Sequence, residues 1–169
     1  DSHYSKKRSL IKWNPAVKKE SDRKAIISGI QNNVIDIIAT DHAPHTIAEK
    51  NNNYCNAPSG GPLVQHAVLA LMDLVKKKEI SLTDVVRKTS HDVAKCFKIE
   101  KRGFLRPGYN ADLVLINRNK EHTVNKNNLL YKCGWSPFEG HSFSSTIDST
   151  IINGEIVFKD GKINESFRG

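Results

Sequence analysis

The chain has 169 residues and a net charge of +8, and 38% of its residues are hydrophobic while 26% are charged. This composition is that of a folded globular protein and excludes a disordered chain. No apolar run approaches the ~20 residues of a membrane-spanning helix, which excludes an ordinary membrane span.

The cysteines and the start of the chain bear on its setting. Cys55, Cys96 and Cys133 are an odd number, and none of them forms a CxxC pair. This pattern favours reduced thiols over a disulfide framework and predicts a cytoplasmic protein. The chain starts at Asp1 in a polar stretch without a signal-peptide pattern. Because it lacks an initiator Met, we expect it to begin inside a longer protein.

The first forty residues carry the pattern of a strand, a helix and a second strand. Residues 9–13 are predicted to form a short strand that Pro15 ends. Ser21 is predicted to cap a helix that runs to about Gln31 and carries isoleucines on one face. The apolar run 34–39 has the length of a strand buried on both faces. Residues 9–39 are therefore interpreted as a βαβ unit.

A long polar segment, 41–60, follows and is broken by prolines, glycines and consecutive asparagines. Loops of this length in compact domains are often functional. Apolar spacing then predicts an amphipathic helix over 63–77. Ser81 and Ser90 are each predicted to cap a further helix.

The sequence changes character after residue 100, where turn residues separate short runs of β-forming residues. Residues 111–116 are predicted to form a strand, and 146–158 to form a hairpin that turns at Asn153-Gly154. Asp160-Gly161 predicts a second turn. We therefore expect a boundary near 98–103 between an α/β part and an antiparallel β part.

The motif with the clearest chemical meaning directly follows the predicted strand 34–39. It reads Thr40-Asp41-His42-Ala43-Pro44-His45. In a parallel α/β sheet, side chains just past the carboxyl end of a strand line the site. Asp41 holds that position, and a carboxylate there can ligate Zn²⁺ or take a proton from water. Taken alone, the motif fits an Asp–His pair that only caps a loop equally well.

Blocks of sequence around this motif resemble those of dihydroorotases, which belong to the amidohydrolase superfamily. The matching blocks are 12–18, 38–46 with Glu49-Lys50, and 57–62, and they stand in the family's order and spacing. Residues 108–115 and 133–140 resemble the family's small β domain. The His45 position, four residues after Asp41, favours a dihydroorotase over hydantoinase-like or allantoinase-like enzymes.

The resemblance implies an α/β fold made of two incomplete parts. Residues 1–100 would be the last strands and helices of a (β/α)8 TIM barrel, and 101–169 a segment of a small β-sandwich domain. A complete barrel needs roughly 250 residues, so an N-terminal portion of the same enzyme is expected as a partner.

The implied activity is the zinc-dependent, reversible cyclisation of N-carbamoyl-L-aspartate to L-dihydroorotate in pyrimidine biosynthesis, with two Zn²⁺ ions in the complete site. Asp41 is expected to ligate metal and to act as general base or acid. Asn14 is expected to bind the substrate, and His45 its α-carboxylate. The backbone around Pro58 and Gly60 is expected to contact the ring.

Part of the family's metal site is absent from the sequence. No His-x-His pair occurs in the chain, nor do the family's bridging lysine and its later metal-binding histidines. A single carboxylate cannot hold a binuclear zinc site. The isolated segment is therefore predicted to be inactive.

Other conspicuous residues are interpreted as structural. His42 is predicted to pack beside the loop, and His66 to be a helix residue and not a ligand. Trp13 and Trp135 are predicted to be packing residues, and nothing near Cys55 marks it as a nucleophile.

Three alternatives stay open. One is an inactive dihydroorotase-like subunit that supports a partner enzyme, and another is a related cyclic amidase of the dihydropyrimidinase or allantoinase type. The third, a basic nucleic-acid-binding module, is disfavoured because aromatic and basic residues are not interleaved. A small-molecule substrate is expected as a partner, nucleic acid and membrane are not, and a homo-oligomer is left open.

Overall fold

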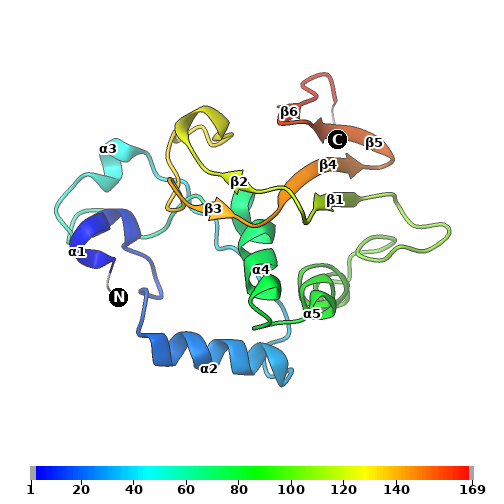
Figure 1. The fold of residues 1–169 in the computed structure, drawn as a ribbon, viewed down its shortest axis with the longest axis horizontal. Coiled ribbons are helices and arrows are strands. Elements are labelled where there is room, and N and C mark those ends of the chain that lie inside the picture. Colours follow the sequence, from blue (N-terminus) through cyan, green and yellow to red (C-terminus); the bar gives the residue numbers. More distant parts are fainter. Residues whose placement is uncertain (1–2, 168–169) are drawn as a thin grey trace.

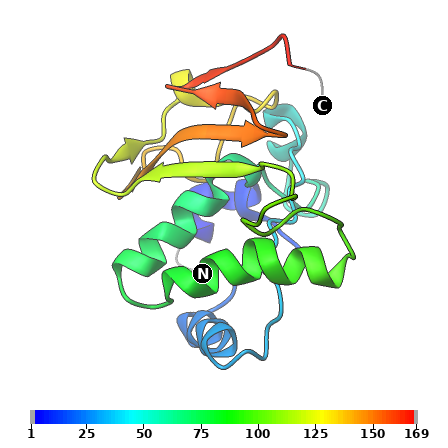
Figure 2. The ribbon, with the colours of Figure 1, turned by 90° about the vertical axis from the view of Figure 1, so that its right-hand side faces the viewer.

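The computed structural model describes residues 3–167, which form layers of helices beneath an antiparallel sheet (Figures 1 and 2). The helices of the first hundred residues are α1 (Tyr4–Lys7), η1 (Arg8–Ile11), α2 (Glu20–Gln31), α3 (Ile47–Lys50), η2 (Val64–His66), α4 (Ala67–Lys76), α5 (Leu82–Val86), η3 (Arg87–His91) and α6 (Asp92–Cys96). The later elements are β1 (Leu113–Asn117), β2 (His122–Thr123), η4 (Lys126–Asn128), β3 (Ser142–Phe143), β4 (Thr146–Ile152), β5 (Glu155–Lys159) and β6 (Lys162–Ile163). In the described residues, no helix is long and apolar enough to cross a membrane.

The strand predicted at 9–13 is wrong, because this segment forms the 3₁₀ helix η1. Its last backbone hydrogen bond runs from the Lys12 amide to the Ser9 carbonyl at 3.0 Å. The turn buries Ser9 and Ile11. A short apolar run can meet its backbone hydrogen bonds locally in this way when no neighbouring strand is present.

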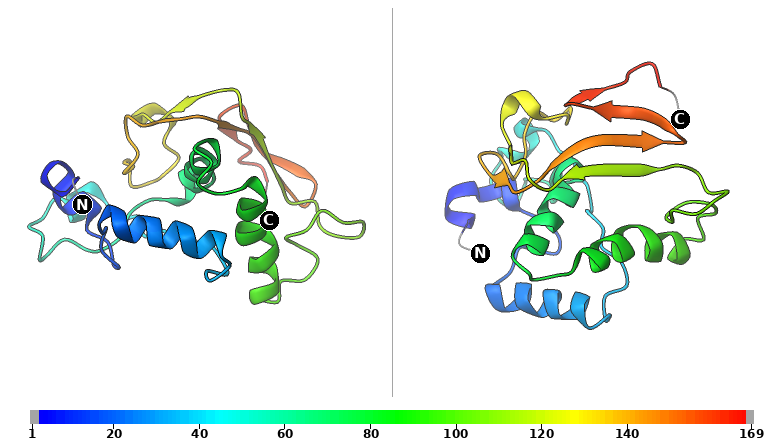
Figure 3. Two further views of the ribbon diagram at one scale, coloured as in Figure 1. Left: turned by 60° about the horizontal axis from the view of Figure 1, so that its bottom comes forward. Right: turned by 45° about the vertical axis from the view of Figure 1, so that its right-hand side comes forward.

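The helix predicted up to Gln31 is confirmed as α2, but its predicted cap is wrong. The helix starts at Glu20, one residue before Ser21. The Asp22 carboxylate accepts a hydrogen bond from the Lys19 amide at 3.0 Å, so an acidic side chain in the first turn takes up a backbone donor at the helix start. Figures 1 and 3 show α2 as the layer furthest from the sheet, with α4 between them.

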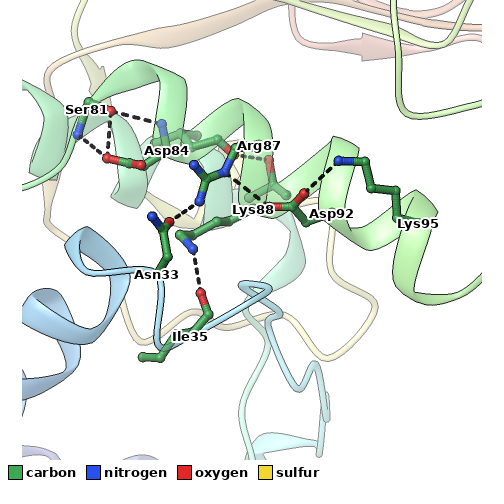
Figure 4. A network of polar contacts seen from close by, with 10 residues as sticks. Asn33, Ile35, Ser81, Asp84, Arg87, Lys88, Asp92 and Lys95 are labelled. Carbon is green, nitrogen blue, oxygen red and sulfur yellow. Dashed lines mark hydrogen bonds and ion pairs between the residues drawn. The ribbon is translucent and has the colours of Figure 1, made fainter.

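The predicted strand 34–39 is extended but has no strand partner within residues 3–167. It lies instead against η3, through the fully buried Lys88 (Figure 4). The Lys88 ammonium donates to the Ile35 carbonyl at 2.5 Å, and the Ile38 amide donates to the Lys88 carbonyl at 2.9 Å. A β-strand needs a neighbouring strand to pair with, so the predicted βαβ unit does not form within the described residues. The segment is extended, but it is not a strand.

The helices after the long loop are mostly as predicted. The helix expected over 63–77 is found as η2 followed by α4. Ser81 caps α5 as predicted, but Ser90 caps nothing, because it lies within the π-helical turn η3 that joins α5 to α6. Val85 of α5 packs with Ile30 and Ile80 in a buried cluster, which holds α2 against the α4–α5 corner.

Removing the Ser81 cap is expected to lower the free energy of unfolding by about 1 kcal/mol. The Ser81 hydroxyl accepts the Asp84 amide at 3.0 Å, and the Asp84 carboxylate accepts the Ser81 amide at 3.2 Å (Figure 4). Urea unfolding of Ser81→Ala measures the loss. Thr83→Ala, at an exposed position in the same helix, is the matched control and should not destabilise. Equal effects of the two substitutions would contradict the capping role.

The β part is an antiparallel sheet of order β1-β4-β5-β6 and a separate β2-β3 ribbon. The predicted strand at 111–116 is confirmed as β1, and the predicted hairpin as β4–β5. Asn153 and Gly154 have φ of 52° and 86°, the left-handed values that a type I′ turn requires. Phe143 and Val124 pack on Leu69 of α4, so this helix joins the two parts of the molecule.

An apolar cavity of about 410 Å³ lies between the start of α4 and the sheet. Its lining includes Val68, Leu69, Ile147, Val157 and Phe158. Apolar side chains at the sheet are also exposed, among them Val114, Leu115 and Ile156. The division into a domain of residues 1–100 and one of 101–169 stays a prediction.

Candidate active site

Three segments that are distant in sequence meet at a small cleft of about 140 Å³. Its walls are the chain after η1, the end of the extended segment and the end of the long loop. The lining residues are Trp13, Asn14, Pro15, Thr40, Asp41, Gly60, Gly61 and Leu63. Three of the five predicted site residues, Asn14, Asp41 and Gly60, are therefore brought together.

Asp41 stands at a point where the backbone is left-handed. Its φ is 46°, a left-handed conformation that L-residues other than Asn and Asp seldom adopt. The next residue, His42, forms a parallel bridge with Gly61, and the Ala43 amide donates to the Gly61 carbonyl at 3.1 Å. These contacts fix the turn, so the exposed Asp41 side chain is held where the extended segment meets the loop.

Gly60 closes the cleft at a position that no other residue can occupy without strain. Its φ is 120°, and a Cβ atom there would lie 2.5 Å from the Ala43 Cβ. The Gly60 amide donates to the Lys12 carbonyl at 3.0 Å. The loop can approach the Asp41 segment this closely only because residue 60 has no side chain.

His45 and Pro58 are not among the residues that line the cleft. The His45 Nε2 lies 3.1 Å from the Ser59 carbonyl oxygen, and the His45 carbonyl accepts the Trp135 indole N–H at 2.8 Å. The Pro58 carbonyl accepts a hydrogen bond from the Lys50 ammonium at 2.9 Å. Both residues belong to the loop that forms one wall of the cleft, but they do not line its open space.

Two histidines predicted to be structural have structural contacts. The His42 Nδ1 accepts the amides of Leu63 at 3.0 Å and Val64 at 3.3 Å, and its ring stacks on Tyr131. His66 is fully buried, and burial lowers its pKa to about 4. His42 therefore joins the loop to the start of η2, while His66 belongs to the core.

Two residues of this region were not predicted from the sequence to belong to the site. Trp13, predicted to be a packing residue, lines the cleft, and its buried indole N–H has no hydrogen-bond partner in the described part of the chain. Lys50, to which no role was assigned, is fully buried under the loop. Both stand in blocks that carry the family resemblance, but a lysine at the end of a short helix gives no sequence signal of burial.

The described residues do not make up a zinc site. Within residues 3–167 no group of three His, Cys, Asp or Glu side chains is placed to hold a metal ion. Asp41 is one carboxylate, whereas a zinc site takes three or four protein ligands. The described residues therefore do not hold zinc by themselves.

Comparison with known proteins identifies the family. The family model "Amidohydrolase family" matches residues 5–157. The chain belongs to this family. It is 36% identical over 150 residues to the dihydroorotase of Clostridium acetobutylicum, and the aligned region covers 88% of this chain and 35% of the relative. With the dihydroorotase of Pyrococcus furiosus, the identity is 36% over 163 residues, covering 96% of this chain and 38% of the relative.

Solved structures of amidohydrolase proteins share the fold. The crystal structure of dihydropyrimidinase from Brevibacillus agri superposes with a TM-score of 0.87 at 22% identity, covering 96% of this chain and 37% of that one. The L-hydantoinase of Arthrobacter aurescens gives the same TM-score of 0.87, the same 22% identity and the same coverage. The α/β fold class predicted from the sequence is confirmed, and the chain spans little more than a third of the length of these relatives.

Proposed function

We propose that the protein containing this chain is a cyclic amidohydrolase that interconverts L-dihydroorotate and N-carbamoyl-L-aspartate, a reaction of pyrimidine biosynthesis. The observation that carries the proposal is the cleft in which Asn14, Asp41 and Gly60 meet from three segments. The 36% identity to two dihydroorotases supports this choice of substrate.

Asp41 is proposed as the proton-transfer group. In ring opening its carboxylate takes a proton from the water that attacks the ring carbonyl carbon, and it gives this proton to the ring nitrogen as the C–N bond breaks. In ring closure it takes a proton from the attacking nitrogen and returns it to the oxygen that leaves as water. Asn14 lines the same cleft, and its side-chain amide can both donate to and accept from an amide of the substrate. His45 is proposed to bind the substrate's α-carboxylate, and the backbone around Pro58 and Gly60 to contact the ring.

Zinc is part of the proposal, with Asp41 as the ligand that this chain contributes. A bound Zn²⁺ ion would polarise the amide carbonyl that is attacked. The other ligands for two ions would come from an N-terminal portion of the enzyme. In this arrangement residues 1–100 complete the barrel and 101–169 belong to the small β domain.

The test compares two rings that differ only in a carboxylate, L-dihydroorotate and dihydrouracil, as substrates of the purified full-length protein. We expect kcat/KM for dihydroorotate to be higher by at least about 100-fold, because a site built to bind a charged group discriminates strongly against its absence. Metal analysis of the same preparation checks for zinc. A preference for dihydrouracil would indicate a dihydropyrimidinase-type enzyme. Turnover of neither ring would indicate an inactive subunit. Either result would overturn the proposal.

A further inference from the structure

The strongest feature that the proposed reaction leaves unused is a buried lysine under the cleft wall. Lys50 is 0% exposed, although lysines are almost never fully buried unless their charge is compensated. It ends helix α3, which begins with a capping box in which Thr46 and Glu49 bond each other's backbone amides at 2.7 and 3.3 Å. This fixed turn directs the Lys50 side chain beneath the loop.

All three donors of the Lys50 ammonium are used on backbone carbonyls. They donate to Gly60 at 2.8 Å, to Pro58 at 2.9 Å and to Lys12 at 3.1 Å. An ammonium group has three donors, so this set is complete. Burial, together with the nearby charge of Lys12, lowers the pKa of Lys50. Burying the ammonium is unfavourable, but an apolar side chain at this position would leave the carbonyls of Pro58 and Gly60 without this donor.

The three acceptors belong to two walls of the cleft. Lys12 lies two residues before Asn14, and Gly60 itself lines the cleft. The Lys12 carbonyl also accepts the Gly60 amide at 3.0 Å, so the two walls share one acceptor. Lys50 thus bonds to the loop at two points and to the Asn14 segment at one.

A second lysine holds the more distant half of the same loop. The Lys12 ammonium donates to the carbonyls of Tyr54 at 2.7 Å and of Ala57 at 2.7 Å. Together the two lysines bond the backbone of the loop from residue 54 to residue 60. A segment without helix or strand hydrogen bonds would otherwise be among the least stable parts of the molecule.

From this arrangement we infer that Lys50 is a positioning residue, which sets the loop wall of the cleft at Pro58 and Gly60 against the segment that carries Asn14. Lys50 is not itself among the residues that line the cleft, and it reaches the lining only through the carbonyl of Gly60. The inference rests on the proposed function only for its effect on substrate binding. Its effect on the loop can be measured without substrate.

The test compares Lys50→Met with Lys88→Met in the full-length protein. Lys88 is the matched control because its ammonium is equally buried and also donates to a backbone carbonyl, that of Ile35. Hydrogen exchange is followed by mass spectrometry in a peptide covering 58–63. Lys50→Met is expected to raise exchange there at least about tenfold, and Lys88→Met to leave it unchanged. Equal exchange in the two variants would overturn the inference.

The second readout is the division between KM and kcat for dihydroorotate. Because a misplaced loop weakens binding without removing Asp41, Lys50→Met should raise KM about tenfold and change kcat by less than about threefold. Lys50→Arg keeps the charge and several donors and should therefore give a smaller rise in KM. It replaces Lys50→Met in the test if the methionine variant does not fold. Increased exchange with an unchanged KM would also overturn the inference. If the unaltered protein turns over no ring, the proposed function fails while the exchange comparison still decides the role of Lys50 in the loop.

Discussion

Replacing Asp41 by asparagine is expected to lower kcat for dihydroorotate hydrolysis by about 10²- to 10⁴-fold, the range contributed by a positioned general acid or base. The amide cannot accept the proton of the attacking water. KM should change less than kcat, because the proton transfer itself is needed only in the transition state. Steady-state kinetics in both directions of the reaction give the two parameters.

Asparagine is the suitable replacement because of the backbone at this position. Asp41 has a φ of 46°, and Asn adopts this conformation at least as readily as Asp, whereas Ala does not. The melting temperature of Asp41→Asn should therefore stay near that of the parent protein. Asp36→Asn removes a carboxylate from an exposed position in the same extended segment and is the matched control. Parent-level turnover in Asp41→Asn would show that Asp41 is not the proton-transfer group.

Local sequence signals predicted the elements whose stability is itself local. The Asn153-Gly154 turn, the Ser81 cap and the helix over 63–77 are all found. In each case the decisive physics lies within a few residues: left-handed φ values, a hydroxyl that accepts a backbone amide, or apolar spacing along one face.

The two predicted strands failed for the opposite reason. Residues 9–13 and 34–39 are short apolar runs, which periodicity alone cannot assign to a strand. Whether such a run becomes a strand depends on a neighbour in space. Within residues 3–167 the neighbour of 34–39 is the helical turn η3, through Lys88, and not another strand. No property of the run itself predicts this partner.

The candidate site likewise has residues that the sequence predicts and a support that it does not predict. Asn14, Asp41 and Gly60 could be named because each stands in a motif that resembles the family, and the structure gathers them. The support beneath them could not be predicted, since Lys50 acts through three backbone carbonyls, one of which lies 38 residues from it along the chain. Every residue has a backbone carbonyl, so residue identity does not show which carbonyls accept these hydrogen bonds.

Lowering the pH from 7 to 4 is expected to reduce the free energy of unfolding by about 3 kcal/mol through His66, because one pKa unit corresponds to ~1.4 kcal/mol. His66 is fully buried between Phe143, Phe138 and Tyr131, and burial lowers its pKa from 6.5 to about 4, with a smaller contribution from the charge of His122. The buried Nε2 atom has no hydrogen-bond partner among residues 3–167, so a proton there would be uncompensated.

The direction follows from proton binding. Below pH 6.5 the unfolded chain protonates this histidine while the folded protein does not, so the unfolded state binds more protons and stability falls with pH. The stabilisation is complete above about pH 6.5 and is lost progressively down to the folded pKa of about 4. Carboxylates with lowered pKa values, such as Asp73, lose their stabilisation mostly below this range.

Substitution separates the contribution of His66 from those of other groups. His66→Phe places an aromatic ring among the same aromatic neighbours without a titrating nitrogen, whereas His3→Gln removes an exposed histidine and is the control. Urea unfolding at fixed ionic strength between pH 7 and pH 4 should show a loss smaller by about 3 kcal/mol in His66→Phe than in the parent or in His3→Gln. If all three proteins lose stability equally, acid does not act through this side chain. The expectation rests on the complete burial of the His66 ring between α4 and the β part, because removing the charged form from water is unfavourable.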